Sequence, residues 1–395
     1  MTRITLHALE GVEPPVVVRV SGDPALVREA AAGLPEGPAT PEAIAARVQR
    51  SGGELTWGEP TPMAAVGSYV DYCGARGEAS VAVFRADPAL LPSLQLGSYF
   101  DAPFSRRAVR RLLLALRSPA RAADAAFWSG VRSAATASEW RRLTRSSYVV
   151  LYYHRIAGDR KQGQERLDVS PRVFELHMRL LRRLGLRPLA PDELVAFHRD
   201  PHATLPRGRF VLCADDAFRD AVLALQRHVD LRPVVFVPTA AVGGNAPWDW
   251  ADGEPIASWS DLQALAGRGG EIASHTRTHA TLPDLDADEL AVELETSWQE
   301  LRAHVHRATP LLAYPHGRAN AAVRAATAAA GYRAAFSTRP GRNGAGTDPY
   351  DLRRVDLKEW DGAAAFAWKA LTGELVPWPI ERWRLRLRAR AYDAA

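Results

Sequence analysis

The chain has 395 residues, of which 47% are hydrophobic and 24% are charged, and this composition is typical of a globular protein and excludes a disordered one. The formal net charge of +5 reflects a mild excess of arginine, which favours anionic partners without identifying one. Only two cysteines occur, Cys73 and Cys213, so a disulfide framework is excluded and a reducing compartment fits.

The beginning of the sequence, MTRITLH, lacks the apolar stretch of a secretory signal. No window holds the roughly 18 uncharged apolar residues that span a bilayer. We therefore expect a cytoplasmic protein. Because the length exceeds that of most single domains, we also expect a main domain and a smaller one.

Residues 1–143 predict a small α/β domain or extension. The expected strands are residues 16–20 and 80–84, the expected helices are residues 25–32, 41–50 and 106–116, and a helical connection covers about 120–144. This part contains no catalytic motif, and the sequence does not disclose its role.

Residues 144–395 alternate between short apolar runs and amphipathic stretches. The expected strands are 148–153, 209–214, 233–238, 271–274, 311–314 and 332–337, and the expected helices are 171–184, 220–229, 260–268, 286–305 and 320–330. Strands that are apolar on both faces and alternate with helices indicate a parallel sheet covered by helices. So many units in this length predict an α/β fold with a distorted (β/α) barrel, whose chemistry lies where the strands end.

Two expected strands end in polar residues suited to binding a metal ion. Asp215 and Asp216 follow the strand at 209–214, and His275 and His279 follow the strand at 271–274. Two imidazoles and a carboxylate form a three-ligand site with open positions. An aspartate before a helix also serves as an N-cap, so the pair alone does not establish a site. His198 and His202 share the four-residue spacing but follow no strand, and we interpret them as surface residues.

The Asp215-Asp216 pair, the His275-Thr-Arg-Thr-His279 stretch and Ala313-Tyr-Pro-His-Gly317 resemble, in order and spacing, the motifs of the polysaccharide deacetylases, the NodB-like carbohydrate esterases of family four. The likeness extends from about residue 148 to at least 361. The run from Val149 to His154 resembles the opening strand of the circularly permuted branch of that family.

The resemblance implies a NodB-type barrel in which Asp216, His275 and His279 bind one divalent metal ion, with zinc first and cobalt, nickel or manganese as alternatives. Asp215 would be the general base, and the backbone N–H of Tyr314 would stabilise the oxyanion. Such chemistry agrees with hydrolysis of an amide, in which a Lewis acid polarises the carbonyl and lowers the pKa of water.

Hydrolysis that releases an amine also requires a general acid. The resemblance to the permuted branch favours His154, and His316 is the rival. A histidine packed at the rim of the barrel is the structural alternative for His154.

Several positions depart from the family pattern. The first motif reads Cys213-Ala-Asp-Asp-Ala217 where the family has Thr-Phe-Asp-Asp-Gly, so the loop after the pair is expected to run differently without the glycine. Cys213 fits a packed thiol better than a ligand or nucleophile. The arginine that precedes the Tyr-Pro motif in some members is absent, and Arg354 is a substitute.

Four residues are expected to bind substrate: Trp248, Trp250, Trp259 and Arg354. For each tryptophan, packing in the core or rim is an equal alternative to stacking on a sugar.

Two arginine-rich stretches, residues 105–117 and 381–390, predict amphipathic helices that touch anionic lipid head groups, with internal packing of the apolar face as the commoner alternative. No nucleic-acid-binding module accompanies them, and no obligate protein partner is indicated.

The sequence therefore predicts a metal-dependent hydrolase that removes an N-acetyl or other N-acyl group from an amino sugar or a glycoconjugate intermediate. A metal-dependent hydrolase of non-sugar C–N bonds is one alternative. A non-catalytic carbohydrate-binding domain is the other.

Overall fold

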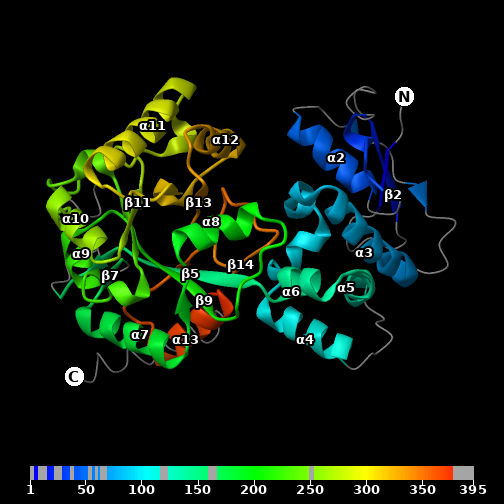
Figure 1. The fold of residues 1–395 in the computed structure, drawn as a ribbon, viewed down its shortest axis with the longest axis horizontal. Coiled ribbons are helices and arrows are strands. Elements are labelled where there is room, and N and C mark those ends of the chain that lie inside the picture. The colour runs from blue at the N-terminus through cyan, green and yellow to red at the C-terminus, as the bar shows by residue number, and fades with distance from the viewer. Residues whose placement is uncertain are drawn as a thin grey trace, which may run out of the picture. The chain divides into compact units, whose positions relative to one another are not determined.

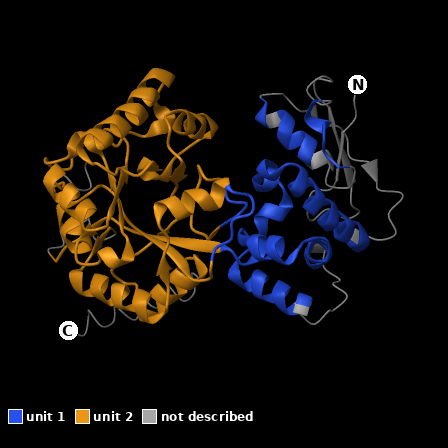
Figure 2. Ribbon diagram, viewed as in Figure 1, with its two compact units in different colours: residues 1–146, 200–205, 344–347 blue, residues 147–199, 206–343, 348–395 orange. Residues whose placement is uncertain are grey.

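The structure is a computed structural model that describes residues 4–7, 16–21, 29–35, 40–51, 56–57, 61–62, 69–115, 123–158, 167–248 and 253–376. The chain divides into two compact units (Figure 2). Unit 1 comprises residues 1–146, 200–205 and 344–347, and unit 2 comprises the remainder. Trp250 and residues 381–390 lie outside the described residues.

Unit 1 combines a small antiparallel sheet with a set of helices (Figure 1). The sheet has β2 between β1 on one side and the short strands β3 and β4 on the other. The elements are β1 (Ile4–His7), β2 (Val16–Ser21), α2 (Thr40–Arg50), β3 (Thr56–Trp57), β4 (Thr61–Pro62), α3 (Tyr69–Ala86), η1 (Pro88–Ser93), η2 (Gln95–Phe100), α4 (Phe104–Ala115), α5 (Ala123–Ala134) and α6 (Ala137–Thr144).

The strand expected at residues 80–84 is wrong, because these residues lie within the long helix α3. Val81, Val83 and Phe84 are buried there. A short apolar run has the same appearance in a buried strand and in a buried helix, and its length alone did not separate the two.

Helices α3 and α5 pack with their backbones in close approach. A Cβ on Gly77 would lie 2.1 Å from the carbonyl oxygen of Phe127, and a Cβ on Gly130 would lie 1.9 Å from that of Gly74. Small residues at a helix crossing permit such an approach, and it buries Phe127 and Trp128 within unit 1.

Unit 2 is built on a curled, mainly parallel sheet whose strands follow the order β13, β12, β11, β10, β9, β5 (Figure 1). The principal strands are β5 (Ser147–Tyr153), β9 (Arg209–Ala214), β10 (Val234–Val237), β11 (Glu271–Ser274), β12 (Leu311–Ala313), β13 (Ala334–Phe336) and β15 (Val355–Asp356). The six strands predicted in this part from apolar runs are all present. Three of them are one to three residues shorter than predicted, and β5 begins one residue earlier.

The two ends of this sheet are joined into a barrel. Strand β15 pairs in parallel with β5, through Val355 opposite Leu151 and Asp356 opposite Tyr152. Immediately before it, Leu352 forms a parallel bridge with Phe336 at the end of β13. One segment therefore touches both edge strands, and the expected distorted (β/α) barrel is confirmed.

The helices lie outside the barrel and cover its strands. They are α7 (Pro171–Arg183), α8 (Pro191–Arg199), α9 (Arg219–Leu225), α10 (Trp259–Gly267), α11 (Ala287–His304), α12 (Ala321–Ala329) and α13 (Ala363–Thr372). Short elements complete unit 2: β6 (Arg155–Ile156), β7 (Asp168–Val169), β8 (Arg187–Pro188), β14 (Asn343–Gly344), η3 (Val229–Leu231), η4 (Thr239–Ala241), η6 (Leu282–Asp284) and η7 (Pro315–Gly317). The layer between strands and helices forms the main hydrophobic core. No described helix is long and apolar enough to cross a membrane.

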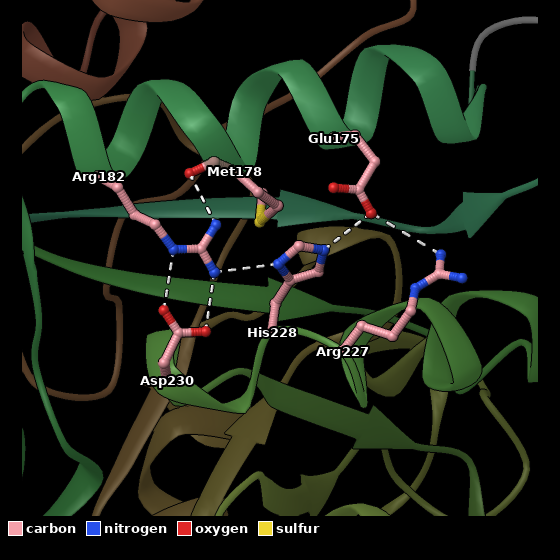
Figure 3. Close-up of polar contacts among 6 residues, drawn as sticks. All are labelled: Glu175, Met178, Arg182, Arg227, His228 and Asp230. Carbon is pink, nitrogen blue, oxygen red and sulfur yellow. Dashed lines mark hydrogen bonds and ion pairs between the residues drawn. The ribbon is translucent and has the colours of Figure 1, made fainter.

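A network of hydrogen bonds connects the turn before β10 to helix α7 (Figure 3). Arg182 donates two hydrogen bonds to Asp230 and a third, 3.1 Å long, to Nδ1 of His228. Because Nδ1 accepts, the His228 ring is a neutral tautomer whose Nε2–H donates to Glu175 at 3.0 Å. This histidine thus has a structural role in unit 2.

Close packing of α3 on α5 predicts that Gly77→Ala destabilises the protein. The added Cβ would meet the Phe127 carbonyl oxygen, so the helices must separate at a cost of about 1–3 kcal/mol. Gly267→Ala is the matched control, because it lies in a helix with no atom within 4 Å of the new Cβ, and it should stabilise by about 0.5–1 kcal/mol. Urea unfolding followed by circular dichroism measures both. Equal effects of the two substitutions would contradict the close approach.

Candidate metal centre and active site

Polar residues follow four parallel strands at the same end of the barrel. His154 follows β5, Asp215 and Asp216 follow β9, His275 follows β11, and Tyr314 follows β12. Because parallel strands share one carboxyl edge, these residues are brought to one mouth of the barrel.

Asp216, His275 and His279 form a compact cluster. Nε2 of His275 lies 3.4 Å from Oδ1 of Asp216, and Nε2 of His279 lies 3.3 Å from the same oxygen. All three ligand atoms lie within 4.8 Å of one another. Tetrahedral bonds of about 2.0–2.1 Å place two ligand atoms about 3.4 Å apart, so the spacing fits one shared cation.

The chemistry of Asp216 also fits a cation. Both of its carboxylate oxygens are buried and lack a hydrogen-bond partner. A buried carboxylate is costly unless it is paired or bound to a metal ion. Burial raises the pKa of Asp216, but the attraction of His275, followed by that of His279 and His154, outweighs burial and lowers it to about 2.

The two histidines differ in their protonation. Burial and the neighbouring charge of His275 lower the pKa of His279 to about 4, so this ring is neutral near pH 7 and can ligate. Burial also disfavours the charged form of His275, but its contact with Asp216 and the charges of both aspartates outweigh burial and raise its pKa. Cation binding therefore displaces a proton from His275, and affinity should rise with pH through that pKa.

Backbone and side-chain contacts fix both imidazoles. Nδ1 of His275 lies 2.7 Å from the carbonyl oxygen of Ala313, which can only accept, so Nδ1 carries the proton and Nε2 faces Asp216. The loop between the histidines is held by Glu293 of α11. Its carboxylate accepts hydrogen bonds from the backbone N–H of Arg277 and of Thr278, each 2.9 Å, and from the Thr278 hydroxyl at 2.6 Å.

Glu293 was not predicted from the sequence. It is a buried charge on the face of α11 that also buries Leu290, Leu294, Ser297 and Leu301. A glutamate on an otherwise apolar helical stripe is the signal that could have revealed it.

Asp215 forms a buried ion pair with Arg354. Nη1 of Arg354 donates to Oδ1 of Asp215 at 2.6 Å, and Nε donates to the carbonyl oxygen of Ser337 at 3.0 Å. The guanidinium also lies over the ring of Tyr152, 4.4 Å from its centroid. Arg354 therefore orients the carboxylate of Asp215.

The loop after the aspartates keeps a left-handed backbone despite the missing glycine. Asp216 has φ 65° and Ala217 has φ 53°. Ala217, which stands where the family has glycine, therefore adopts a positive φ that is costly for a residue with a Cβ. The backbone of Ala217 accepts a hydrogen bond from Ala257, and Phe218 bridges to Ile256, so the neighbouring segment holds the strained conformation.

The expected oxyanion role of the Tyr314 backbone needs correction. Its N–H donates to the carbonyl oxygen of Phe336 at 3.0 Å, so it belongs to the pairing of β12 with β13. The Tyr314 side chain is buried, and its hydroxyl donates to the carbonyl oxygen of Tyr350. Tyr314 is thus a core residue at the end of a strand.

Both candidate acids lie near the cluster. The ring of His316 is 4.9 Å from that of His279, at a residue with φ 57°. Burial, followed by the charges of His275 and Arg318, lowers the pKa of His316. His154 is half-buried, lies 5.5 Å from the ring of Tyr152, and is close enough to stabilise ionised Asp216.

Of the tryptophans expected to bind substrate, Trp248 lies beside the cluster and Trp259 does not. Trp248 lies against the ligand His279, with ring centroids 4.7 Å apart. Trp259 stacks on His304 at 4.2 Å and packs on the core, and its described contacts do not reach the metal cluster. A cavity of about 650 Å³ beside Arg354 is lined in part by Tyr152, Lys358 and Trp360.

Cys213, His198 and His202 are not part of the cluster of Asp216, His275 and His279. Cys213 is fully buried in β9, and burial raises the pKa of its thiol, which fits a packed side chain. His198 lies 2.9 Å from the hydroxyl of Tyr148 through its Nε2, and His202 is exposed.

Residues 204–335 match the family model described as polysaccharide deacetylase. This segment belongs to the polysaccharide deacetylase family. It contains Asp215, Asp216, His275 and His279, and the family description supports a hydrolytic enzyme that acts on the C–N bond of an N-acetylated carbohydrate.

Solved structures similar to this chain include two proteins described as deacetylases and the protein IcaB. The Streptococcus pyogenes deacetylase PplD in complex with acetate is 19% identical, with a TM-score of 0.48 and coverage of 55% of this chain and 95% of that one. IcaB from Ammonifex degensii is 23% identical, with a TM-score of 0.49 and coverage of 57% of this chain and 97% of that one. A polysaccharide deacetylase from Bacillus cereus is 25% identical, with a TM-score of 0.48 and coverage of 57% of this chain and 69% of that one. No curated protein sequence matches the chain.

The position of Glu293 predicts that Glu293→Ala weakens metal binding. Without its carboxylate, two backbone N–H groups lose their acceptor and the loop that carries both histidines loosens. Loss of such a supporting contact typically lowers metal affinity 10- to 100-fold. Titration calorimetry with zinc measures the change. Glu293→Gln, which keeps an acceptor oxygen, is the control and should lose less, so equal losses would contradict the proposed positioning.

Proposed function

We propose that unit 2 is a metal-dependent N-deacylase, which removes an acetyl group from an amino sugar or a glycoconjugate intermediate. The observation that carries this proposal is the convergence of Asp216, His275 and His279 beside an ion-paired Asp215. Zinc fits the nitrogen-rich ligand set best, with cobalt, nickel and manganese as alternatives.

When bound, the metal ion supplies a Lewis acid that polarises the amide carbonyl and lowers the pKa of water. Asp215 accepts a proton from water as the water oxygen adds to the carbonyl carbon. The buried Arg354 fixes the orientation of Asp215, because its Nη1 donates to Asp215 at 2.6 Å and its Nε donates to the carbonyl oxygen of Ser337.

The negative charge that develops on the carbonyl oxygen needs a donor other than the N–H of Tyr314. The turn Pro315–Gly317 begins at Pro315, so the N–H of His316 lies in its first turn and has no acceptor within the turn. We assign the oxyanion contact to the N–H of His316. Its left-handed backbone, with φ 57°, turns the chain sharply at this point.

The amine leaves after a proton reaches its nitrogen. His154 is assigned as the donor, because it follows β5 at the same mouth of the barrel and its charge acts on Asp216. His316 lies against His279, and its lowered pKa leaves it less able to carry the proton at neutral pH. Trp248, beside His279, is placed to contact the sugar ring.

The proposed activity predicts release of amine from N-acetylated amino sugars. A panel of N-acetylated monosaccharides, oligosaccharides and acyclic amides, with amine detection after metal loading, measures it. Turnover confined to sugars supports the proposal. Turnover confined to acyclic amides favours a hydrolase of non-sugar C–N bonds, and no turnover by a metal-loaded protein that binds sugars favours a non-catalytic domain.

The assignment of the acid predicts different effects of the two histidines. His154→Ala should lower kcat about 10²- to 10⁴-fold, the usual contribution of a general acid, with metal content unchanged. His316→Ala keeps the backbone N–H and should cost much less. Near-normal turnover of the His154 variant would reject it as the acid.

A further inference from the structure

Helix α4 of unit 1 buries two of its arginines and exposes several of its apolar side chains. The sequence predicts four arginines in solvent opposite a packed apolar stripe. The structure instead buries Arg107 and Arg110, while Phe104, Val109 and Leu112 are 39%, 56% and 58% exposed. The expected orientation of this helix is therefore wrong.

Contacts within unit 1 explain why two arginines are buried. Arg110 donates two hydrogen bonds to Asp124, of 2.7 and 2.8 Å, and its guanidinium lies 5.0 Å from the ring of Tyr99 and 4.9 Å from that of Trp128. Arg107 donates to the carbonyl oxygen of Phe100. These contacts hold both arginines inside unit 1 and leave the opposite face of α4 exposed.

The outward face has an apolar centre. Residues 104, 108 and 112 follow one another at four-residue spacing and so lie on one side of the helix. Phe104, Ala108 and Leu112 occupy these positions, and Val109 adjoins them. All four are exposed.

Arginines border this apolar centre on both sides. Arg111 lies three residues after Ala108, and Arg106 lies three residues before Val109 on the other flank. Both arginines are exposed, and α4 contains no acidic residue. Asp124 is 3.4 Å from Arg106 but is already shared with Arg110, so the face keeps a net positive charge.

A helix with an exposed apolar face bordered by arginines is typical of helices that lie at the surface of a bilayer. We propose that the outward face of α4, formed by Phe104, Arg106, Ala108, Val109, Arg111 and Leu112, docks on an anionic lipid surface. The apolar side chains enter the interface between head groups and acyl chains, and the arginines contact lipid phosphates. A second copy of the chain fits less well, because its own arginines would meet these arginines.

The test is cosedimentation of the full chain with vesicles of equimolar phosphatidylglycerol and phosphatidylcholine. Binding is expected at low salt, reduced at high salt and reduced on pure phosphatidylcholine, because screening weakens the attraction of the arginines. Val109→Ser/Leu112→Ser should lower the partition coefficient at least tenfold. The matched control Val292→Ser/Leu371→Ser, which changes two exposed apolar residues of unit 2, should leave it unchanged.

Charge is tested in the same assay. Arg106→Gln/Arg111→Gln should lower binding to anionic vesicles about fivefold for each arginine. Arg179→Gln/Arg183→Gln on the exposed side of α7 is the control and should bind as the parent does. Absence of binding at low salt, or equal losses in variants and controls, would overturn the proposal. A dimer by sedimentation velocity that Val109→Ser/Leu112→Ser dissolves would also overturn it, in favour of a second copy.

Discussion

The catalytic end of the barrel depends on one buried negative charge. Both carboxylate oxygens of Asp216 are buried, and neither has a hydrogen-bond partner. Nε2 of His279 and Nε2 of His275 approach one of these oxygens at 3.3 and 3.4 Å. Such a charge is stable only beside a positive one. Because His279 is neutral near pH 7, the positive charge comes from the proton on His275, whose pKa is raised, or from a bound cation that displaces this proton. The site is therefore arranged for a cation shared by these three side chains.

The same region holds most of the strained backbone. Six non-glycine residues among the described ones have positive φ, and five of them, Asp216, Ala217, Thr276, His279 and His316, lie at this end of the barrel. A left-handed conformation costs such a residue about 1–2 kcal/mol. Glu293 and the pairing near Ala257 hold these loops, so packing elsewhere in unit 2 sustains a geometry that the loops alone would not adopt.

The barrel and the approach of Asp216, His275 and His279 to one another were largely predictable, because both depend on local signals. Apolar runs located the strands β5 and β9 to β13, and parallel pairing placed these three residues at one edge, whereas the two-residue strand β15 was not predicted. The errors share a different cause. Residues 80–84, the Tyr314 N–H and the buried Arg107 and Arg110 all depend on partners outside their own helix or strand, namely α5, Phe336, Phe100 and Asp124. Neither propensity nor periodicity contains those contacts.

The most direct test is the metal content of the purified protein after exposure to zinc and removal of the excess, measured by mass spectrometry of the elements. The account predicts about one ion per chain in the parent and close to none in Asp216→Asn, which has the same shape without the charge. Asp215→Asn should retain the ion. A parent protein that holds no divalent ion, or an Asp216→Asn variant that holds as much as the parent, would contradict the account.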